Sequence, residues 1–412
     1  MKTIYGRAIG SHIVKTHNFF RLIICIILIL VVSSFTISFA AGAGQDNTVP
    51  DIIEKQSASE GIGTIEDELY KYIDDENIEI LDGYKPEDII RDVSGGKFVF
   101  DYSNIANSII KILFKEIYLN LGILLKLAFL IVICSLLKNI QSSFLNESTS
   151  EIAFYVCYIL IISILLVSFS TAVQLSSDII SKMVSFMYTT VPVLIALLIS
   201  GGNITTGGIL HPVMLLAVQI SATLIRSIFI PMIFLSTIIS AVNNISNRIQ
   251  FSKLAAFIKQ IITWGMGTIM TAFVAIVSLQ GTLGAVVDGV TSKAAKFAIG
   301  TFIPIVGKTI SDAADTVIGC TLLIKNAAGF AVMLGLIIIC IIPLIKILAL
   351  VALYKAACAV LEPICEARIA NCINDVAGSI LSIFAVTASV AFMFMITVTA
   401  LISAGNQSAM LR

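Results

Sequence analysis

The chain has little charge, few histidines and no paired cysteine motif, and each shortage excludes a class of protein. Only 13% of its 412 residues are charged, about half of what ordinary globular domains carry. Three histidines and no HExxH sequence exclude a zinc protease of that type. None of the eight cysteines forms a CxxC motif, and no strongly basic segment indicates nucleic-acid binding.

What the chain has instead is apolar residues, which make up 58% of it and give a mean hydropathy of +0.99. A chain this apolar requires a lipid bilayer as its solvent. Period-two alternation, which a membrane β-barrel needs, is absent. The sequence therefore predicts an all-α, polytopic integral membrane protein with about 6–8 transmembrane helices. Runs of spanning length lie at about 117–137, 152–174, 184–200, 209–242, 260–283, 328–350 and 379–403.

One of these runs is interrupted. Residues 209–242 contain Arg226 and Pro231, so this run is either one kinked span or two short ones. The answer decides the number of crossings between residues 184 and 242. Three crossings there would place the basic stretch 248–259 on the same side as Lys138, and the positive-inside rule favours that.

The first 43 residues resemble a secretory signal. Basic residues precede an apolar stretch at 22–37, and small residues follow up to Ala40 or Ala43. The alternative is an uncleaved anchor helix. Both place residues 44–100 outside the cytoplasm. This segment is acidic, with 16 acids and 5 bases between residues 44 and 101, and is either a solvated tether or a docking segment. Residues 101–412 form the multi-span membrane domain.

A polar element interrupts the membrane domain at 286–326. Gly300, Pro304 and Gly307 break helix continuity, and a helix restarts with Thr309 as its cap. Asp312 and Asp315 then occupy the first turn, where the helix dipole favours negative charge, and Lys308 pairs with Asp312. The pattern predicts an amphipathic or re-entrant segment, which either lines a polar path or lies at the membrane interface.

Enzyme chemistry has little support in the sequence. Gly307-Lys308-Thr309 resembles the end of a nucleotide-binding loop, but Phe302 occupies the position of the required first glycine. His211 is the one histidine beyond the predicted signal, beside a proline in a glycine-rich stretch, and it has no recognisable catalytic partner. We therefore expect no catalytic, cofactor-binding or metal-binding residues, and no cofactor.

Two further charges lie within apolar runs. Lys126 is central in 117–137, and Arg226 interrupts 209–242. Ionisable residues at membrane depth are functional candidates, although long basic side chains also extend to the membrane surface. Cysteines 358, 365 and 372 recur every seven residues and are interpreted as packing residues rather than a soft-metal site. The candidates for a polar path or subunit interface are Gly300, Pro304, Gly307, Lys308, Asp312, Asp315, Arg226 and Lys126.

Three stretches resemble the stage III sporulation protein AE family. The most specific is "FIPIVGKTISDAADTVIGC" followed by "LLIKNAAG", and the others are residues 95–140 and 354–380. The resemblance extends over most of 95–405. It implies a protein of endospore-forming bacteria, made in the mother cell and located as a multi-pass protein in the mother-cell membrane that surrounds the forespore.

The resemblance also implies partners. The family belongs to a channel or secretion-like complex that links mother cell and forespore, with other stage III sporulation proteins, a separate ATPase subunit and the forespore stage II sporulation protein Q. The first hypothesis is therefore a non-enzymatic membrane subunit of that complex. The alternatives are a stand-alone secondary permease with a substrate site at broken helices, and an intramembrane hydrolase that uses His211.

Overall fold

The computed structural model of the chain describes residues 60–72, 102–142, 147–244, 251–302 and 307–410. These residues are helical apart from short turns, and no strand occurs among them, which confirms the all-α class. The predicted signal sequence and most of the acidic segment lie outside the described residues. The elements are α3 (Glu60–Tyr72), α6 (Tyr102–Ser142), α7 (Glu147–Ser200), α8 (Ile204–Leu224), η1 (Ile225–Phe229), α9 (Ile230–Asn243), α10 (Ser252–Phe302), α11 (Gly307–Leu361) and α12 (Ala367–Met410).

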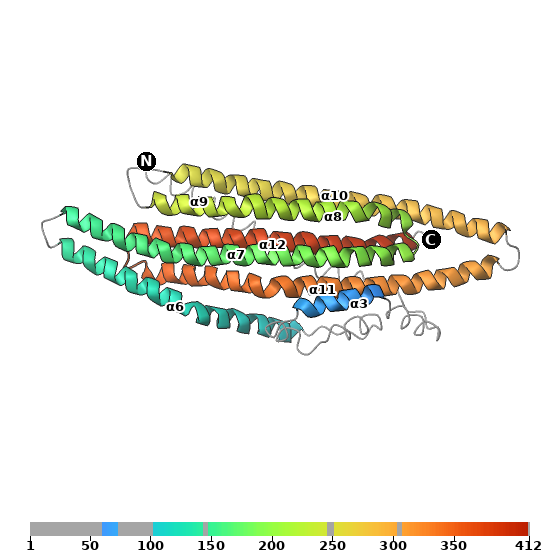
Figure 1. Ribbon diagram of the computed structural model, residues 1–412, viewed down its shortest axis with the longest axis horizontal. Coiled ribbons are helices and arrows are strands. Elements are labelled where there is room, and N and C mark those ends of the chain that lie inside the picture. Colours follow the sequence, from blue (N-terminus) through green and yellow to red (C-terminus); the bar gives the residue numbers. More distant parts are fainter. Residues whose placement is uncertain (1–59, 73–101, 143–146, 245–250, 303–306, 411–412) are drawn as a thin grey trace. The chain divides into compact units, whose positions relative to one another are not determined.

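Six helical stretches in the described residues are long and apolar enough to cross a membrane, which confirms a multi-span architecture. Figure 1 shows that successive stretches run in opposite directions. The α6–α7, α9–α10 and α11–α12 connections therefore lie at one end of the bundle, and the α7–α8 and α10–α11 connections at the other. The stretches are Asn107–Leu137, Tyr155–Ser200, Ile204–Asn243, Ser252–Leu279, Thr309–Leu361 and Ala367–Asn406.

The expectation of two separate spans at 152–174 and 184–200 is wrong, because α7 runs unbroken from Glu147 to Ser200. The polar residues between the two runs lie on one side of the helix. Asp178 and Lys182 are exposed, whereas Ile179 and Met183 are buried. The dip in hydropathy is therefore an exposed polar face and not a turn.

Residues 204–243 also form one continuous helical path, so Arg226 and Pro231 do not end it. Five residues, Ile225–Phe229, adopt π-helical geometry, and Pro231 follows two residues after them. Proline removes one N–H donor and clashes with the preceding turn, and a π-helical turn is one way that a helix accommodates such an interruption. Three crossings between 184 and 242 are therefore wrong. The basic stretch is expected on the same side as the end of α6. The structure agrees with this for Lys253, because α7 is a single helix and the start of α10 therefore lies at the same end of the bundle as the end of α6.

The helices are much longer than a bilayer is thick. At 1.5 Å per residue, the 54 residues of α7 extend about 80 Å, whereas the hydrocarbon core measures about 30 Å. Even a tilt of about 40° would leave about 60 Å along the membrane normal. Parts of α7 and of the 55-residue α11 therefore lie outside the hydrocarbon core.

Helices α7, α11 and α12 form the centre of the bundle, and α6 and α10 lie at its periphery. The most apolar window of α11 is 61% buried and that of α12 is 50% buried, against 17% for α6 and 22% for α10. A buried hydrogen bond between the hydroxyls of Ser176 on α7 and Thr387 on α12 joins two of the central helices. The peripheral helices present their apolar side chains to lipid or to other proteins.

Part of the acidic segment packs against this bundle. Ile62, Ile65 and Leu69 on one face of α3 are buried against α7 and α11. Gly335 on α11 permits this close approach, because a Cβ there would overlap Leu69 and Phe186. Asp67 and Lys71 are exposed on the other side of α3, and Lys71 pairs with the buried Glu68. Residues 60–72 are therefore anchored to the membrane domain and do not form a free tether.

Candidate functional site at the α10–α11 hairpin

The predicted polar element consists of the two arms of a helical hairpin. We define the hairpin arms as residues 286–302 of α10 and 307–320 of α11. The Lys296 Nζ lies 2.8 Å from the Asp315 Oδ1, so an ion pair joins the arms. Both arms also expose apolar side chains, among them Phe297, which is 76% exposed, and Val290 at 65%. Mixed apolar and charged surface of this kind is typical of an interaction site.

The structure changes several details of the predicted element. The helix break expected near Pro304 falls at residues 303–306, which lie outside the described residues, as does the side chain of Lys308. Helix α11 begins at Gly307, so Thr309 lies in its first turn and not at its cap. Asp315 pairs across the hairpin with Lys296. The sequence could predict ion pairs only between neighbours on one helix. A partner on another helix lies at no fixed number of residues along the chain.

Asp288 anchors the α10 arm to the start of α8. Its carboxylate oxygens accept the backbone N–H groups of Thr205 and Thr206 at 2.9 and 2.8 Å, and the residue is 3% exposed. These N–H groups have no partner within α8 because they belong to its first turn. Burial alone would raise the pKa of Asp288, but the hydrogen bonds from the two threonines outweigh it and lower the pKa. The ionised form is therefore favoured.

A tight turn brings the start of α8 to Asp288. Gly202 has a φ of 79°, which favours glycine because it has no Cβ. The next residue, Asn203, is fully buried, and its side-chain amide donates to the Gly201 carbonyl at 3.2 Å. Residues 201–203 therefore form a tight, hydrogen-bonded turn between α7 and α8.

Lys325 is buried where α11 leaves the hairpin. It is 1% exposed, and its Nζ donates to the Ile402 carbonyl on α12 at 2.8 Å. No carboxylate among the described residues pairs with it. Gly405 is necessary for this position, because a Cβ there would overlap the Lys325 Nζ. An ionisable side chain buried in this way in a membrane protein is a strong candidate for function.

A second polar contact lies directly beside Lys325. The Asn326 side-chain amide donates to the Asn406 Oδ1 at 3.2 Å, again between α11 and α12. Consecutive residues of α11 thus hold the last turns of α12. The hairpin base, which we define as Asp288, Lys325, Asn326, Gly405 and Asn406, connects α8, α10, α11 and α12. The side chains of these residues hold helices together. None of them is a catalytic nucleophile beside a proton-accepting group.

The remaining sequence candidates do not converge on this site. Lys126 is exposed on the outer face of α6, which packs against α7 and α11. Arg226 is exposed in η1, between α8 and α9. These two residues therefore lie on helices other than the hairpin arms, and a polar path or subunit interface formed by the eight candidates stays a prediction.

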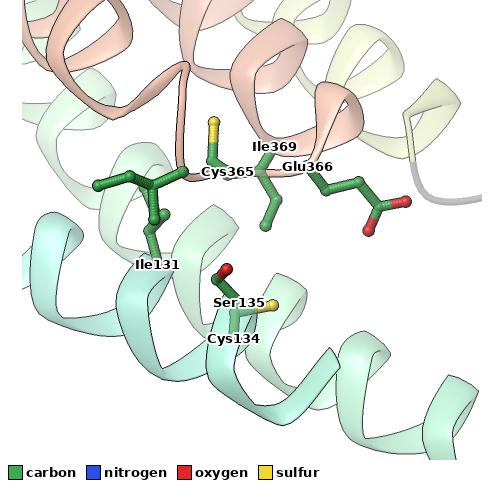
Figure 2. Close-up of a pocket in the computed structure, with 7 residues that line it drawn as sticks. Ile131, Cys134, Ser135, Cys365, Glu366 and Ile369 are labelled. Atoms are coloured by element: carbon green, nitrogen blue, oxygen red, sulfur yellow. The ribbon is translucent and has the colours of Figure 1, made fainter. Parts of the chain in front are cut away.

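A small pocket of about 190 Å³ lies between α6 and the α11–α12 turn. Figure 2 shows Cys134 and Ser135 on α6 facing the turn that carries Cys365 and Glu366. Cys358, Cys365 and Cys372 are distributed over α11, this turn and α12, so their seven-residue spacing does not place them on one helix. No group of three or more metal-ligating side chains occurs within the described residues.

Sequence reasoning missed most of the hairpin base. Lys325 lies at the end of the predicted polar element, directly before an apolar run, so the rule for ionisable residues at membrane depth could have found it. Asp288, Gly405 and Asn406 gave no such signal. Their roles depend on helices that are far apart in the chain, and no local pattern reports those contacts.

The chain is similar to known proteins in two comparisons. The family model described as "Stage III sporulation protein AE" matches residues 84–405. The chain is also similar to a protein of Bacillus subtilis (strain 168) named "Stage III sporulation protein AE", with 36% identity over 300 residues. That alignment covers 73% of this chain and 75% of the relative. No solved structure matches the chain.

Proposed function

Because this chain belongs to the stage III sporulation protein AE family and so has a role in sporulation, we propose that it is a non-enzymatic subunit of a channel or secretion-like complex between mother cell and forespore. In this proposal it is located in the mother-cell membrane around the forespore. Its partners are other stage III sporulation proteins, a separate ATPase subunit and the forespore stage II sporulation protein Q. Six helices of spanning length support the multi-pass arrangement.

The observation that carries the proposal is the α10–α11 hairpin. The hairpin base holds it against two other helices, α8 and α12, while its arms expose Phe297 and Val290 beside the Lys296–Asp315 pair. A rigid support with an exposed mixed surface suits protein–protein contact. If residue 44 lies outside the cytoplasm, four crossings return the chain to that side at the hairpin. The hairpin would then face the forespore partner.

The structure offers no support for nucleotide binding at Gly307-Lys308-Thr309. A phosphate-binding loop follows a β-strand and wraps the phosphates with glycine-rich backbone. Here the preceding residues 252–302 form α10, and Gly307 is the first residue of α11. An energy source on a separate ATPase subunit agrees with this arrangement.

The alternative, a stand-alone secondary permease, requires helices broken near the membrane midplane around a substrate site. Among the described residues, α10 ends at Phe302 and α11 begins at Gly307, at one end of the bundle. The π-helical turn at Ile225–Phe229 leaves its helix continuous, and Arg226 faces outward. The permease therefore has less structural support than the complex subunit.

The test replaces the three charged residues of the α11 arm with neutral residues of similar size: Lys308→Gln, Asp312→Asn and Asp315→Asn. We expect fewer heat-resistant spores and weaker co-purification with partner subunits, at an unchanged amount of protein in the membrane. A matched control, Asp178→Asn with Lys182→Gln, removes exposed charges from α7. Unchanged sporulation after the triple substitution would reject the role of the hairpin, and substrate transport by the purified chain alone in liposomes would favour the permease.

A further inference from the structure

Lys126 lies in the middle of an uninterrupted apolar stretch of α6. The nearest charges in the sequence are Glu116 and Lys138, which are 22 residues apart, or about 33 Å along the helix. This distance matches the thickness of the hydrocarbon core, about 30 Å. Lys126 is 10 residues from Glu116, or about 15 Å. Lysines at the ends of a membrane helix reach the interface by extending their side chains, but Lys126 is close to the centre.

The bundle itself leaves Lys126 uncompensated. The residue is exposed, and no carboxylate or other hydrogen-bonding group among the described residues contacts its amine. The contrast with Lys346 is informative, because Lys346 on α11 lies 3.7 Å from Glu116 and so has a carboxylate beside it. A lysine at the centre of a lipid-facing helix is unfavourable even by the insertion scale that gives the lowest values. Something outside this chain is therefore expected to compensate the charge.

The surroundings of Lys126 suit a second helix. Gly122 lies one turn before it and is exposed, and a Cβ at that position would meet nothing within 4 Å. A glycine on a helix surface leaves room for a second membrane helix to approach closely. Leu119 and Phe129, 65% and 67% exposed, lie on the same side of α6 one to two turns away. We call Leu119, Gly122, Lys126 and Phe129 the α6 outer face.

We propose that the α6 outer face binds a transmembrane helix of a partner protein that carries an aspartate or glutamate near its midpoint. The carboxylate pairs with Lys126, and Gly122 receives the partner helix. A second copy of this chain fits less well. Two α6 outer faces packed symmetrically would bring Lys126 against Lys126, and α6 contains no acid between Glu116 and Lys138. The proposal rests on membership of a membrane complex but does not depend on the hairpin.

The test moves the charge without changing composition. In the double variant Leu125→Lys, Lys126→Leu, the lysine shifts by one residue and therefore by about 100° around the helix. Its depth and the hydropathy of α6 stay almost the same. The full chain is produced in sporulating cells with a photo-crosslinking residue at Leu119, and Lys126→Arg serves as the control that keeps the charge in place.

We expect the native chain and Lys126→Arg to crosslink to one partner helix with an acidic residue near its midpoint. The shifted-lysine variant should reach the membrane in equal amount but lose this crosslink and co-purification at least about tenfold. Lys126→Glu should lose them too, and a lysine at the partner's acidic position should restore them. Crosslinks to lipid alone, crosslinks to a second copy, or equal partner binding by the shifted-lysine variant would each overturn the proposal. Hairpin variants would retain the crosslink even if the hairpin had no function.

Discussion

The amine of Lys325 on α11 occupies the space that a side chain at position 405 of α12 would fill. It donates its hydrogen bond to Ile402, one turn before Gly405 on the same helix. The lysine and the glycine are 80 positions apart in the sequence, yet the absence of a Cβ at Gly405 leaves the space that the amine occupies. This close fit, and the polar contacts around it, can be tested by substitution.

Gly405→Ala should destabilise the protein by about 1–3 kcal/mol, because the new methyl group displaces the Lys325 amine and leaves it buried without its acceptor. Thermal unfolding of the purified protein in detergent measures this loss. Gly378→Ala is a matched control on α12, since a Cβ at Gly378 meets nothing within 4 Å. The control should gain about 0.5–1 kcal/mol from helix propensity. Equal stability of the two variants would contradict the contact.

Lys325→Met should leave the thermal stability unchanged or raise it. Methionine fills a similar space, and replacing a buried charge with an apolar residue of similar volume is often neutral or stabilising. The number of heat-resistant spores should nevertheless fall if the buried amine is functional. The combination of preserved melting temperature and lost sporulation separates function from packing. Normal spore counts at preserved stability would show that the amine is dispensable.

Asp288→Asn should cost about 1–2 kcal/mol, because the neutral side chain replaces one of two charge-assisted bonds to the start of α8 with a poorer contact. The pKa of Asp288 is lower in the folded protein than in the unfolded chain. Its stabilising contribution is therefore complete above the unfolded pKa of about 3.9 and is lost as the pH falls through the folded value. The melting temperature of the variant should fall less on acidification. Asp312→Asn, at an exposed position, is the control.

The Lys296–Asp315 pair should contribute little stability. Its side chains are 28% and 42% exposed, so a double-mutant cycle with alanine should give a coupling of about 0.2–1 kcal/mol. Added salt should weaken this coupling because the charges are screened. A much larger, salt-independent coupling would show that the hairpin is more enclosed than its exposure indicates. Whatever the size of the coupling, Lys296→Glu can be combined with Asp315→Lys, which restores the ion pair with its charges exchanged. Loss of partner binding in the single variant and recovery in the double variant would show that the pair acts by holding the two hairpin arms in position.

Several features of the molecule could be predicted from residues alone. The apolar runs predicted helices of spanning length, and the polar interruption at 286–326 predicted the place where α10 gives way to α11. Other features were misread because hydropathy averages over all sides of a helix. Asp178 and Lys182 lowered the average of a helix that stays buried along its other side at Ile179 and Met183. Pro231 suggested a break, but a π-helical turn absorbed it.

The all-helical class, the need for a lipid environment and the charges that stand out within apolar stretches all follow from the residue pattern. Which of those charges are paired and which are buried depends on how the helices pack together. Lys325 is enclosed by α12, Asp288 by the start of α8, whereas Lys126 remains exposed. The physical reason is that burial depends on helices that pack from distant parts of the chain, while hydropathy and helix propensity depend on near neighbours.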